Sequence, residues 1–420
     1  MELLRNAQPR VVITGLGAVT ALGPVNSLWE NLKAGISGIR RIENIEVDHV
    51  PVRIAGEVRD FDPTQYIARK EARRMGRASQ FAAAAASMAV DDAGLTKEGI
   101  EAEGERVGVV MGTSLGSHEM AEQSTFKYKT SGYQKPNPLG LINCLPNMPA
   151  HYISRFFRAF GPLTTPSTAC AAGTQSIGQA SDLIRQGRAD MVIAGGVEAI
   201  LQDYTLAGFY AMTALATGYE DNPTLASRPF DIDRSGFVFS EGCGVMILES
   251  LAHALKRGAR IYAEILGHAS SSDAYHMAAI DPEGKGASRA MQWALDDAHL
   301  NPEDIQYINA HGTSTLVNDP IETLAIKRVF GAHAFQLAVS STKSMLGHAL
   351  AGSGAIEAII CAKSLVDGVI TPTINLDNPD PECDLDYTPN TARTVKKLRY
   401  ILSNSLGLGG QNATIVMGAV

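Results

Sequence analysis

The residues of this sequence best suited to chemistry are a cysteine, two histidines and a lysine set among small residues. Cys170 lies within Pro166–Gly173, and His311 lies between Ala310 and Gly312. Lys343 and His348 both lie in the segment Ser341–His348. A thiol can carry an acyl group, and neutral imidazoles can donate hydrogen bonds to a carbonyl that becomes an enolate. We therefore interpret Cys170, His311, Lys343 and His348 as candidate catalytic residues.

Each of these residues also has a structural interpretation. The cysteine could be a small buried hydrophobic residue, and the histidines could lie at the surface or in a satisfied core. A cysteine with two histidines could also bind a metal ion. However, the separations of 141 and 37 residues match no compact ligand motif, and a structural zinc site needs a fourth ligand. We expect no metal site.

The segments around Cys170 predict how the thiol is held. Leu163–Ser167 is typical of an extended segment, and a helical pattern runs from Ala171 to about Gly187. Cys170 is thus expected at a helix N-terminus, where free N–H groups and the helix dipole stabilise a thiolate. The sequence predicts a lowered pKa for this thiol.

Two further features would support such a site. The turn Gly407–Gly410 can present backbone N–H groups to a thioester oxygen and so form an oxyanion hole. Lys343 is costly to bury without a carboxylate partner. Glu357, Asp319 and Glu322 are the three candidates for that role.

An internal repeat indicates a duplicated architecture. Four residues recur 174 positions later, namely Ser167, Thr168, Gly173 and Gly178 as Ser341, Thr342, Gly347 and Gly352. The tripeptide Gly-Thr-Ser at residues 112–114 also recurs at residues 312–314, 200 positions later. Strands alternate with helices, so we expect a layered α/β fold with two halves, residues 1–258 and 259–420. Two central helices stacked between two sheets would bring Cys170 near His348.

Glycines near the N-terminus invite a nucleotide-binding interpretation. The strand Arg10–Thr14 leads into Gly15–Gly23, but the third glycine of a dinucleotide fingerprint is replaced by Thr20. We instead expect Gly15 and Gly17 to form a tight turn between strand and helix.

A basic stretch, Arg69–Arg77, is predicted to open one helix that runs to about Ala93. Such a run is either a solvated helix face or a docking patch for an acidic partner.

Composition excludes several classes of protein. The net charge is −8 and the pI is about 5.7, so a nucleic-acid partner is not expected. No apolar run reaches the roughly 18 residues that span a bilayer, and the N-terminus has no signal-peptide core. Five scattered cysteines suggest no disulfide framework. We expect a cytoplasmic protein.

Four motifs together resemble the β-ketoacyl-acyl carrier protein synthases over nearly the whole chain, from about Arg10 to Val416. They are Thr168–Cys170, Asn309–Thr315, Ser341–His348 and Asn404–Gly410. The Cys-His-His set resembles the elongating class. The resemblance implies a thiolase-like fold with α-β-α-β-α layers, a homodimer and a ping-pong decarboxylative Claisen condensation. It implies no cofactor, because the phosphopantetheine arrives on the acyl carrier protein.

The resemblance also implies residue roles. Cys170 would take the acyl group, His311 and His348 would stabilise the enolate, and Lys343 would support the histidines electrostatically. The N–H groups of Cys170 and Leu408 would form the oxyanion hole. The resemblance also implies contacts with the substrates. Thr313 and Thr315 would contact the phosphopantetheine arm, and Leu115, Phe209 and Leu408 would line the acyl pocket. The carrier protein would dock on Arg69, Lys70, Arg73 and Arg74.

This sequence departs from the family in its glycine turn, where Leu406 and Leu408 replace two phenylalanines. That departure leaves the acyl chain length open. Some relatives bind a monovalent cation near the positions of Asn309, Glu357 and Asn404, and the sequence leaves open whether this protein does. A polyketide or specialised-lipid ketosynthase has the same catalytic set. A thiolase would need a second cysteine in a Cys-x-Gly setting, which Cys383 does not provide. A non-catalytic chain-length partner would lack the nucleophile.

Overall fold

The computed structural model describes residues 2–5, 8–132 and 137–420. Two groups of five strands share one strand order. The first group runs β3 (Val11–Val19), β9 (Gly242–Ser250), β8 (Met191–Glu198), β6 (Val107–Gly112), β7 (Leu163–Thr164). The second runs β10 (Ala263–Ser272), β16 (Gln411–Gly418), β15 (Tyr400–Gly407), β11 (Tyr307–Asn309), β12 (Ala338–Ser340). In chain order both groups read first, fifth, fourth, second, third strand. The predicted duplication is therefore present in the topology.

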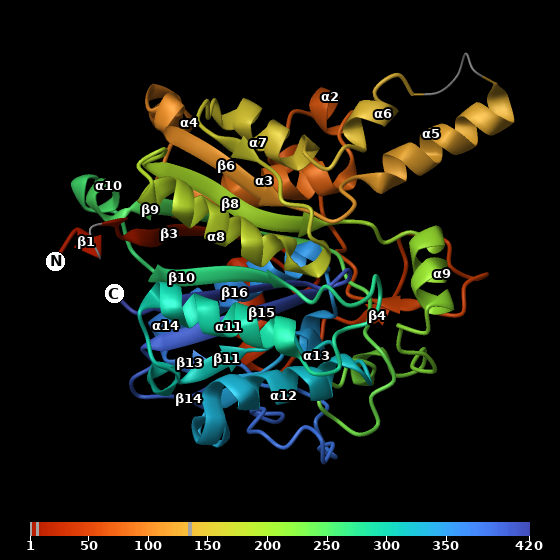
Figure 1. Ribbon diagram of the computed structural model, residues 1–420. Coiled ribbons are helices and arrows are strands. Elements are labelled where there is room, and N and C mark those ends of the chain that lie inside the picture. Colours follow the sequence, from red (N-terminus) through yellow and green to blue (C-terminus); the bar gives the residue numbers. More distant parts are fainter. Residues whose placement is uncertain (1, 6–7, 133–136) are drawn as a thin grey trace.

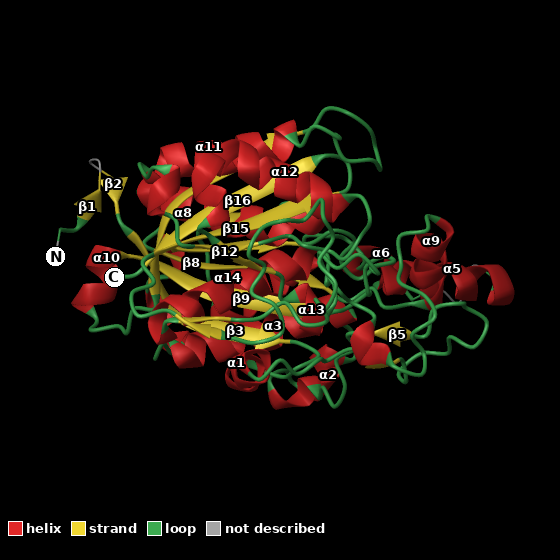
Figure 2. Cartoon of the chain, turned by 90° about the horizontal axis from the view of Figure 1, so that it is seen from below, coloured by secondary structure: helices red, strands yellow, loops and turns green. Residues whose placement is uncertain are grey.

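Among the residues that the structure describes, the two groups of strands pair where β3 meets β10, over three residue pairs from Ala263↔Ile13 to Ile265↔Val11. Beyond that contact the two sheets separate, and helices lie between them (Figures 1 and 2). The central helices are α8 (Ala172–Arg185) and α14 (Ala351–Asp367), and both contact strands of both sheets. Helix α3 (Arg77–Asp92) covers the outer face of the first sheet, and α11 (Lys285–Ala298) covers that of the second. The layers follow the expected α-β-α-β-α order.

The remaining helices connect or flank these layers. They are α1 (Val25–Lys33), α2 (Arg69–Ala72), α4 (Lys97–Ala102), α5 (His118–Ser131), α6 (Gly140–Asn143), α7 (Met148–Phe157), α9 (Asp203–Ala211), α10 (Leu251–Lys256), α12 (Asn318–Phe330) and α13 (Lys343–Leu346). Three short hairpins complete the chain: β1 (Leu4–Arg5) with β2 (Gln8–Pro9), β4 (Arg40–Arg41) with β5 (Ile54–Ala55), and β13 (Val369–Ile370) with β14 (Arg393–Thr394). No helix within the described ranges is long and apolar enough to cross a membrane.

Small residues let the central helices approach each other. A Cβ added at Gly173 would lie 2.4 Å from the carbonyl oxygen of Ala351, and one at Gly354 would lie 2.2 Å from Oγ1 of Thr174. Real Cβ atoms do not come this close to other atoms, so α8 and α14 can cross here only because both positions are glycine. The crossing lies next to Cys170, at the start of both helices.

The glycines near the N-terminus do not form the predicted turn. Gly15 and Gly17 lie inside β3, which continues to Val19. A Cβ at Gly17 would lie 2.0 Å from the carbonyl oxygen of Ala85, and one at Gly15 would lie 2.2 Å from that of Ala89. The glycines therefore serve close packing of α3 against β3, and the prediction of a turn was wrong.

The basic stretch is also not one helix. Helix α2 ends at Ala72 and α3 begins at Arg77, with Arg73–Gly76 between them. Gly76 precedes α3 with an extended backbone, and a Cβ there would lie 2.2 Å from Ser117. The break places four basic side chains on a short exposed segment, whereas Arg77 joins a partly buried ion pair with Glu241.

Candidate active site

Cys170 lies in a single 3₁₀ turn, Ala169–Ala171, directly before α8. Ala169 has a positive φ of 50°, which is strained for a residue with a Cβ and turns the backbone sharply into the helix. The backbone N–H groups of Leu408 and Cys170 both lower the pKa of the Cys170 thiol. A Cβ at Gly407 would lie 3.3 Å from the backbone nitrogen of Cys170, so glycine lets the β15–β16 turn approach the cysteine. An oxyanion hole formed by the N–H groups of Cys170 and Leu408 remains a prediction.

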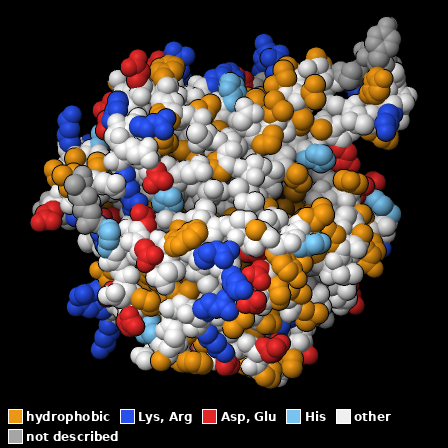
Figure 3. Space-filling view, viewed as in Figure 1, with side chains coloured by type: hydrophobic (Ala, Val, Ile, Leu, Met, Phe, Trp, Pro, Cys, Tyr) orange, Lys and Arg blue, Asp and Glu red, His pale blue; other side chains and the backbone are white. Residues whose placement is uncertain are grey.

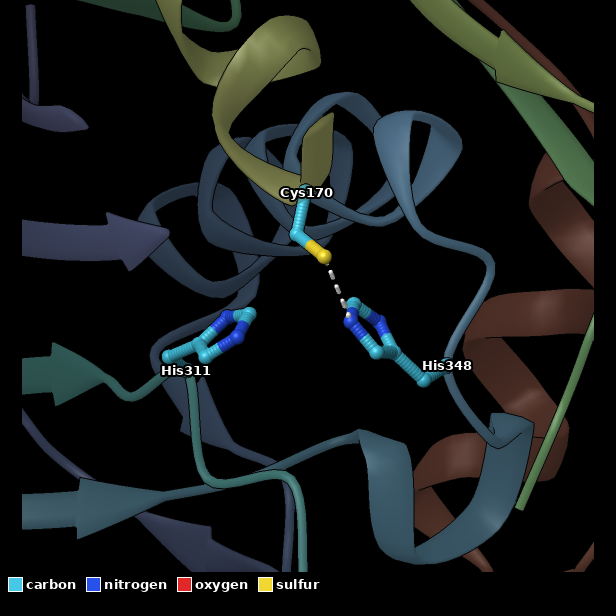
Figure 4. A group of neighbouring side chains, drawn as sticks. All are labelled: Cys170, His311 and His348. Atoms are coloured by element: carbon cyan, nitrogen blue, oxygen red, sulfur yellow. Dashed lines mark hydrogen bonds between the residues drawn. The ribbon is translucent and has the colours of Figure 1, made fainter. Parts of the chain in front are cut away.

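His348 is the nearest polar neighbour of the thiol. Its Nε2 lies 3.1 Å from Sγ of Cys170, as Figure 4 shows. Its Nδ1 lies 3.2 Å from the hydroxyl of Ser353, which also accepts the N–H of Ala349. The ring of Phe237 packs edge-on against the imidazole, with 5.4 Å between ring centroids. The side chain is thus fixed between the nucleophile and the start of α14.

His311 reaches the same space from the loop after β11 (Figure 4). Its ring centroid lies 5.2 Å from that of His348, with the ring planes at 83°. Both oxygens of Glu322, on α12, accept backbone N–H groups, one from His311 and one from Gly312, each at 2.8 Å. Nδ1 of His311 is buried without a hydrogen-bond partner in the described residues. An imidazole nitrogen held this way can bind a substrate oxygen.

Lys343 begins α13, and its ammonium group forms a buried ion pair with Glu357 on α14. This contact decides between the three predicted partners. Glu322 holds the His311 backbone instead, and Asp319 accepts the N–H of Phe230 at 2.9 Å. Burial raises the pKa of Glu357 to about 7, and Lys343 opposes that rise.

The thiol does not have the lowered pKa that its helix position predicts. Burial raises the pKa of Cys170 to about 12, although Lys343 and the N–H groups of Leu408 and Cys170 act in the opposite direction. A side chain 5% exposed loses more solvation on ionising than one helix turn returns. The Cys170 side chain is therefore a neutral thiol at rest, and the prediction of a lowered pKa was wrong.

The two histidines are neutral for a related reason. Burial first, and then the positive charge of Lys343, lower the pKa of both His311 and His348 well below its ordinary value. Neutral imidazoles can donate a hydrogen bond without carrying charge, which agrees with the chemistry expected from the sequence.

The residues predicted to contact substrate lie in different environments. Thr313 and Thr315 follow His311, with their hydroxyl oxygens 3.0 Å apart. Phe209, on α9, packs in the apolar cluster that contains Cys170, 5.5 Å from Phe237 between centroids. Leu115 and Leu408 are each 44% exposed and lie outside that cluster.

The two leucines of the glycine turn differ in their surroundings. Leu406 is buried in β15 as part of the core beneath α11 and α12. Leu408 stands at the exposed tip of the β15–β16 turn. Of the two leucines, Leu408 is the one with an exposed side chain.

The predicted docking residues Arg69, Lys70, Arg73 and Arg74 are all exposed around α2. Glu71 lies among them and pairs with Arg155 on α7. Helix α2 lies near α7 and α6 in Figure 1.

Sequence reasoning missed two contacts of His348, Ser353 and Phe237. Ser353 lies five residues after the histidine, at a helix start where serine hydroxyls commonly bond backbone groups, so its spacing was a usable signal. Phe237 lies 111 positions away in a loop, and no local pattern connects it to the site.

The three side chains are close enough to share a metal ion, because one donor atom from each of Cys170, His311 and His348 lies within 4.8 Å of the others. The expectation that no metal binds here remains a prediction.

Two family models cover most of the chain. The "Beta-ketoacyl synthase, N-terminal domain" matches residues 8–254, and the "Beta-ketoacyl synthase, C-terminal domain" matches residues 262–377. The chain belongs to the beta-ketoacyl synthase family.

Relatives within the family extend this match. A protein of Synechocystis sp. named 3-oxoacyl-[acyl-carrier-protein] synthase 2 is 46% identical over 97% of each chain. The solved ishigamide ketosynthase/chain length factor is 38% identical, covers 99% of this chain and all of its own, and superposes with a TM-score of 0.92. A type II polyketide ketosynthase solved in complex with its acyl-carrier protein is 36% identical, covers 98% and 100%, and gives a TM-score of 0.89.

Proposed function

We propose that this protein is a 3-oxoacyl-[acyl carrier protein] synthase that elongates fatty acyl chains. The proposal rests on one observation above all: a buried thiol, Cys170, lies 3.1 Å from one neutral histidine, and that histidine packs against a second. The name of the Synechocystis relative and its 46% identity support the same reaction.

The first half-reaction is acyl transfer to Cys170. The sulfur attacks the carbonyl carbon of an acyl-carrier-protein thioester, and the C–S bond to the phosphopantetheine breaks. The thiol proton leaves with the phosphopantetheine sulfur. The N–H groups of Cys170 and Leu408 stabilise the oxyanion of the tetrahedral intermediate. Because the resting thiol is neutral, the proton must leave as the carbonyl binds, and His348 is the group within reach to take it.

The second half-reaction joins two carbons. Malonyl-acyl carrier protein loses CO₂, and the resulting enolate oxygen accepts hydrogen bonds from His311 and His348. The α-carbon then attacks the acyl-Cys170 carbonyl, the bond from that carbon to the Cys170 sulfur breaks, and the 3-oxoacyl product leaves on the carrier protein. The Cys170 thiolate regains a proton from solvent. Burial keeps both imidazoles neutral and so able to act as donors, and the charge of Lys343 adds to this effect. This chemistry needs neither a cofactor nor a metal ion.

The carrier protein is proposed to dock on the basic patch of Arg69, Lys70, Arg73 and Arg74, since carrier proteins of this class are acidic. Its phosphopantetheine arm would meet the hydroxyls of Thr313 and Thr315, which lie on the loop that carries His311. The polyketide relative solved with its own carrier protein supports a partner of this kind.

We also propose a homodimer. The first sheet ends at the two-residue edge strand β7, whose residues are exposed. Large apolar side chains are also exposed on α5 and α6, including Phe126 at 70% and Leu141 at 77% (Figure 3 shows hydrophobic side chains over α6 and α9). An open sheet edge and exposed apolar surface each favour pairing with a second copy. Light scattering after size exclusion measures the mass, and a monomer of 44.6 kDa would contradict the proposal.

We propose a cytoplasmic location, which is consistent with five free cysteines.

The central test is intact-protein mass spectrometry after incubation with acyl carrier proteins of graded chain length. The wild type should gain the mass of the acyl group, and Cys170→Ala should not. Cys170→Ala should still decarboxylate malonyl-acyl carrier protein, because both histidines remain, whereas His311→Ala should not. An acyl adduct on Cys170→Ala would refute the assignment of Cys170 as the nucleophile. If the wild type is acylated by acyl-coenzyme A but by no acyl carrier protein, a thiolase-like enzyme that uses coenzyme A thioesters would be favoured.

A polyketide or specialised-lipid ketosynthase is the second candidate, favoured by the two polyketide-type structures at 36% and 38% identity. The same loading assay separates the two. A fatty-acid enzyme accepts saturated acyl chains repeatedly, and a polyketide enzyme accepts chains that retain their keto groups.

A further inference from the structure

Ser353, in the first turn of α14, contacts His348 at the ring nitrogen that the proposed chemistry does not use. Its hydroxyl oxygen lies 3.2 Å from Nδ1 of His348, whereas Cys170 contacts Nε2. The same oxygen accepts the backbone N–H of Ala349 at 2.9 Å. A neutral imidazole carries one proton on either of its two nitrogens, so the direction of the bond to Ser353 fixes which nitrogen carries it.

The ring of His348 is fixed in place from several sides. The backbone N–H of His348 donates to the carbonyl of Val238 at 2.8 Å, and its carbonyl accepts the N–H of Ser240 at 3.0 Å. The ring of Phe237 packs edge-on against the imidazole, with 5.4 Å between centroids. These contacts hold the ring with Nε2 toward Cys170, and they leave the place of its proton undetermined.

The hydrogen bonds of Ser353 decide where that proton lies. Its oxygen already accepts the N–H of Ala349, and a backbone N–H only donates. Among the described residues, Nδ1 of His348 is the one acceptor within reach of the Ser353 hydroxyl proton. Ser353 is 5% exposed, and a buried hydroxyl proton without an acceptor is costly. The hydroxyl therefore donates to Nδ1, and the neutral ring carries its proton on Nε2.

The two proposed half-reactions need different tautomers of His348. In the condensation, Nε2 must carry a proton in order to donate it to the enolate oxygen. In acyl transfer, Nε2 must be free to take the Cys170 thiol proton, so the ring proton must lie on Nδ1. Between the two forms, one nitrogen loses a proton to water and the other gains one from water, and the ring stays neutral. A hydroxyl suits both forms, because it can turn from donating to Nδ1 to accepting the Nδ1 proton.

We propose that Ser353 is a positioning residue whose hydroxyl sets the tautomer of His348, holding Nε2 as a hydrogen-bond donor for the malonyl half-reaction and turning to accept when Cys170 is loaded. This inference rests on the proposed function for its two half-reactions. Ser353 acts through the imidazole ring and touches no reacting atom.

Ser353→Ala tests the role, because it removes the hydroxyl without adding volume. The preference for the form protonated on Nε2 then falls by the worth of one hydrogen bond, which is about fivefold in the ratio of the two tautomers. Each half-reaction uses one tautomer. The rate of malonyl decarboxylation divided by the rate of acyl loading should therefore fall about fivefold. A loss of packing alone would slow both reactions together and leave this ratio unchanged.

Nitrogen NMR of protein that contains isotope-labelled histidine reports the tautomer itself. In the wild type, His348 should show a protonated Nε2 and an unprotonated Nδ1. Comparison with His348→Ala identifies its signals among those of the ten histidines. In Ser353→Ala, both signals should move toward the average of the two tautomers.

Two further variants separate control of the tautomer from general effects. Ser364→Ala removes another buried hydroxyl of α14, one that has no hydrogen-bond partner among the described residues. It should leave the ratio of rates and the His348 signals unchanged. Ser353→Thr keeps a hydroxyl at the same position and should restore most of the wild-type ratio.

The outcomes are distinguishable from failure of the proposed function. If the wild type forms no adduct with any acyl carrier protein, the proposed function fails, and the NMR spectra of the wild type and Ser353→Ala alone decide whether Ser353 sets the tautomer. A wild-type ring protonated on Nδ1 overturns the inference. It is also overturned if Ser353→Ala keeps both the ratio and the spectrum of the wild type, or if Ser364→Ala shifts the ratio equally.

Discussion

The buried ion pair between Lys343 and Glu357 allows a quantitative test of how the site is held. Both side chains are 2% exposed, and they join α13 to α14 beneath the histidines. Even with Lys343 present, burial raises the pKa of Glu357 from 4.5 to about 7. Lys343→Met removes the cation that opposes this rise and keeps the apolar stem.

The sign of the effect follows from proton binding. A carboxyl whose pKa is higher in the folded state binds more protons there, so stability falls as pH rises between the unfolded and folded values. In the wild type the free energy of unfolding falls between pH 4.5 and about 7, the pKa values of Glu357 in the unfolded and folded states. At 1.36 kcal/mol per pH unit this decrease is about 3 kcal/mol, and no further decrease from Glu357 is expected above pH 7. In Lys343→Met the folded value lies higher, so the fall continues above pH 7. The stability gap between the proteins should widen by up to about 3 kcal/mol from roughly pH 7 to pH 9.

Urea unfolding at a series of pH values measures this gap. Lys363→Met is the matched control, because Lys363 also lies on α14 but pairs with Asp367 near the surface, one turn along the helix. The free energy of unfolding of Lys363→Met should stay within about 1 kcal/mol of the wild-type value at every pH. A Lys343→Met gap that does not change with pH would refute the reasoning. Malonyl decarboxylation by the folded variant should also fall, because Lys343 adds to burial in lowering the pKa of both histidines and that contribution is lost.

Three other perturbations test separate features. Arg73→Glu with Arg74→Glu should lower kcat/KM for carrier-protein substrates about tenfold at low salt, and less at high salt; a salt-independent loss would contradict docking by charge. Leu408→Ala should change the chain lengths that load on the enzyme but alter urea stability by less than about 1 kcal/mol, because the side chain is 44% exposed. Gly17→Ala should cost about 3 kcal/mol or more in urea unfolding, because its Cβ would lie 2.0 Å from the carbonyl oxygen of Ala85; a neutral result would disprove the close packing.

Much of the site could be predicted from the sequence because its residue types are specific to its chemistry. Cys170, His311, Lys343 and His348 were found from small-residue surroundings and positions next to predicted strands and helices. The repeat at a spacing of 174 residues predicted two stacked central helices and hence the approach of Cys170 to His348, which the 3.1 Å contact confirms. These features are local or periodic, so the sequence displays them directly.

The features that the sequence did not predict depend on distances between remote segments. Gly15 and Gly17 resemble turn glycines until α3 is seen to pack on β3. The alanine-rich helix breaks at Arg73–Gly76 because Gly76 packs against Ser117. Neither contact partner lies near these glycines in the chain, so no local pattern could have indicated them.

The sequence by itself determined the residue types of the catalytic set, the duplicated α/β plan and the family motifs. Only the tertiary structure decided which carboxylate pairs with Lys343, and that the Cys170 thiol is neutral at rest. Both depend on burial, which sets the cost of a charge and which is a property of the whole packed fold. A helix N-terminus can be recognised in a sequence, but the solvation that its thiol loses cannot.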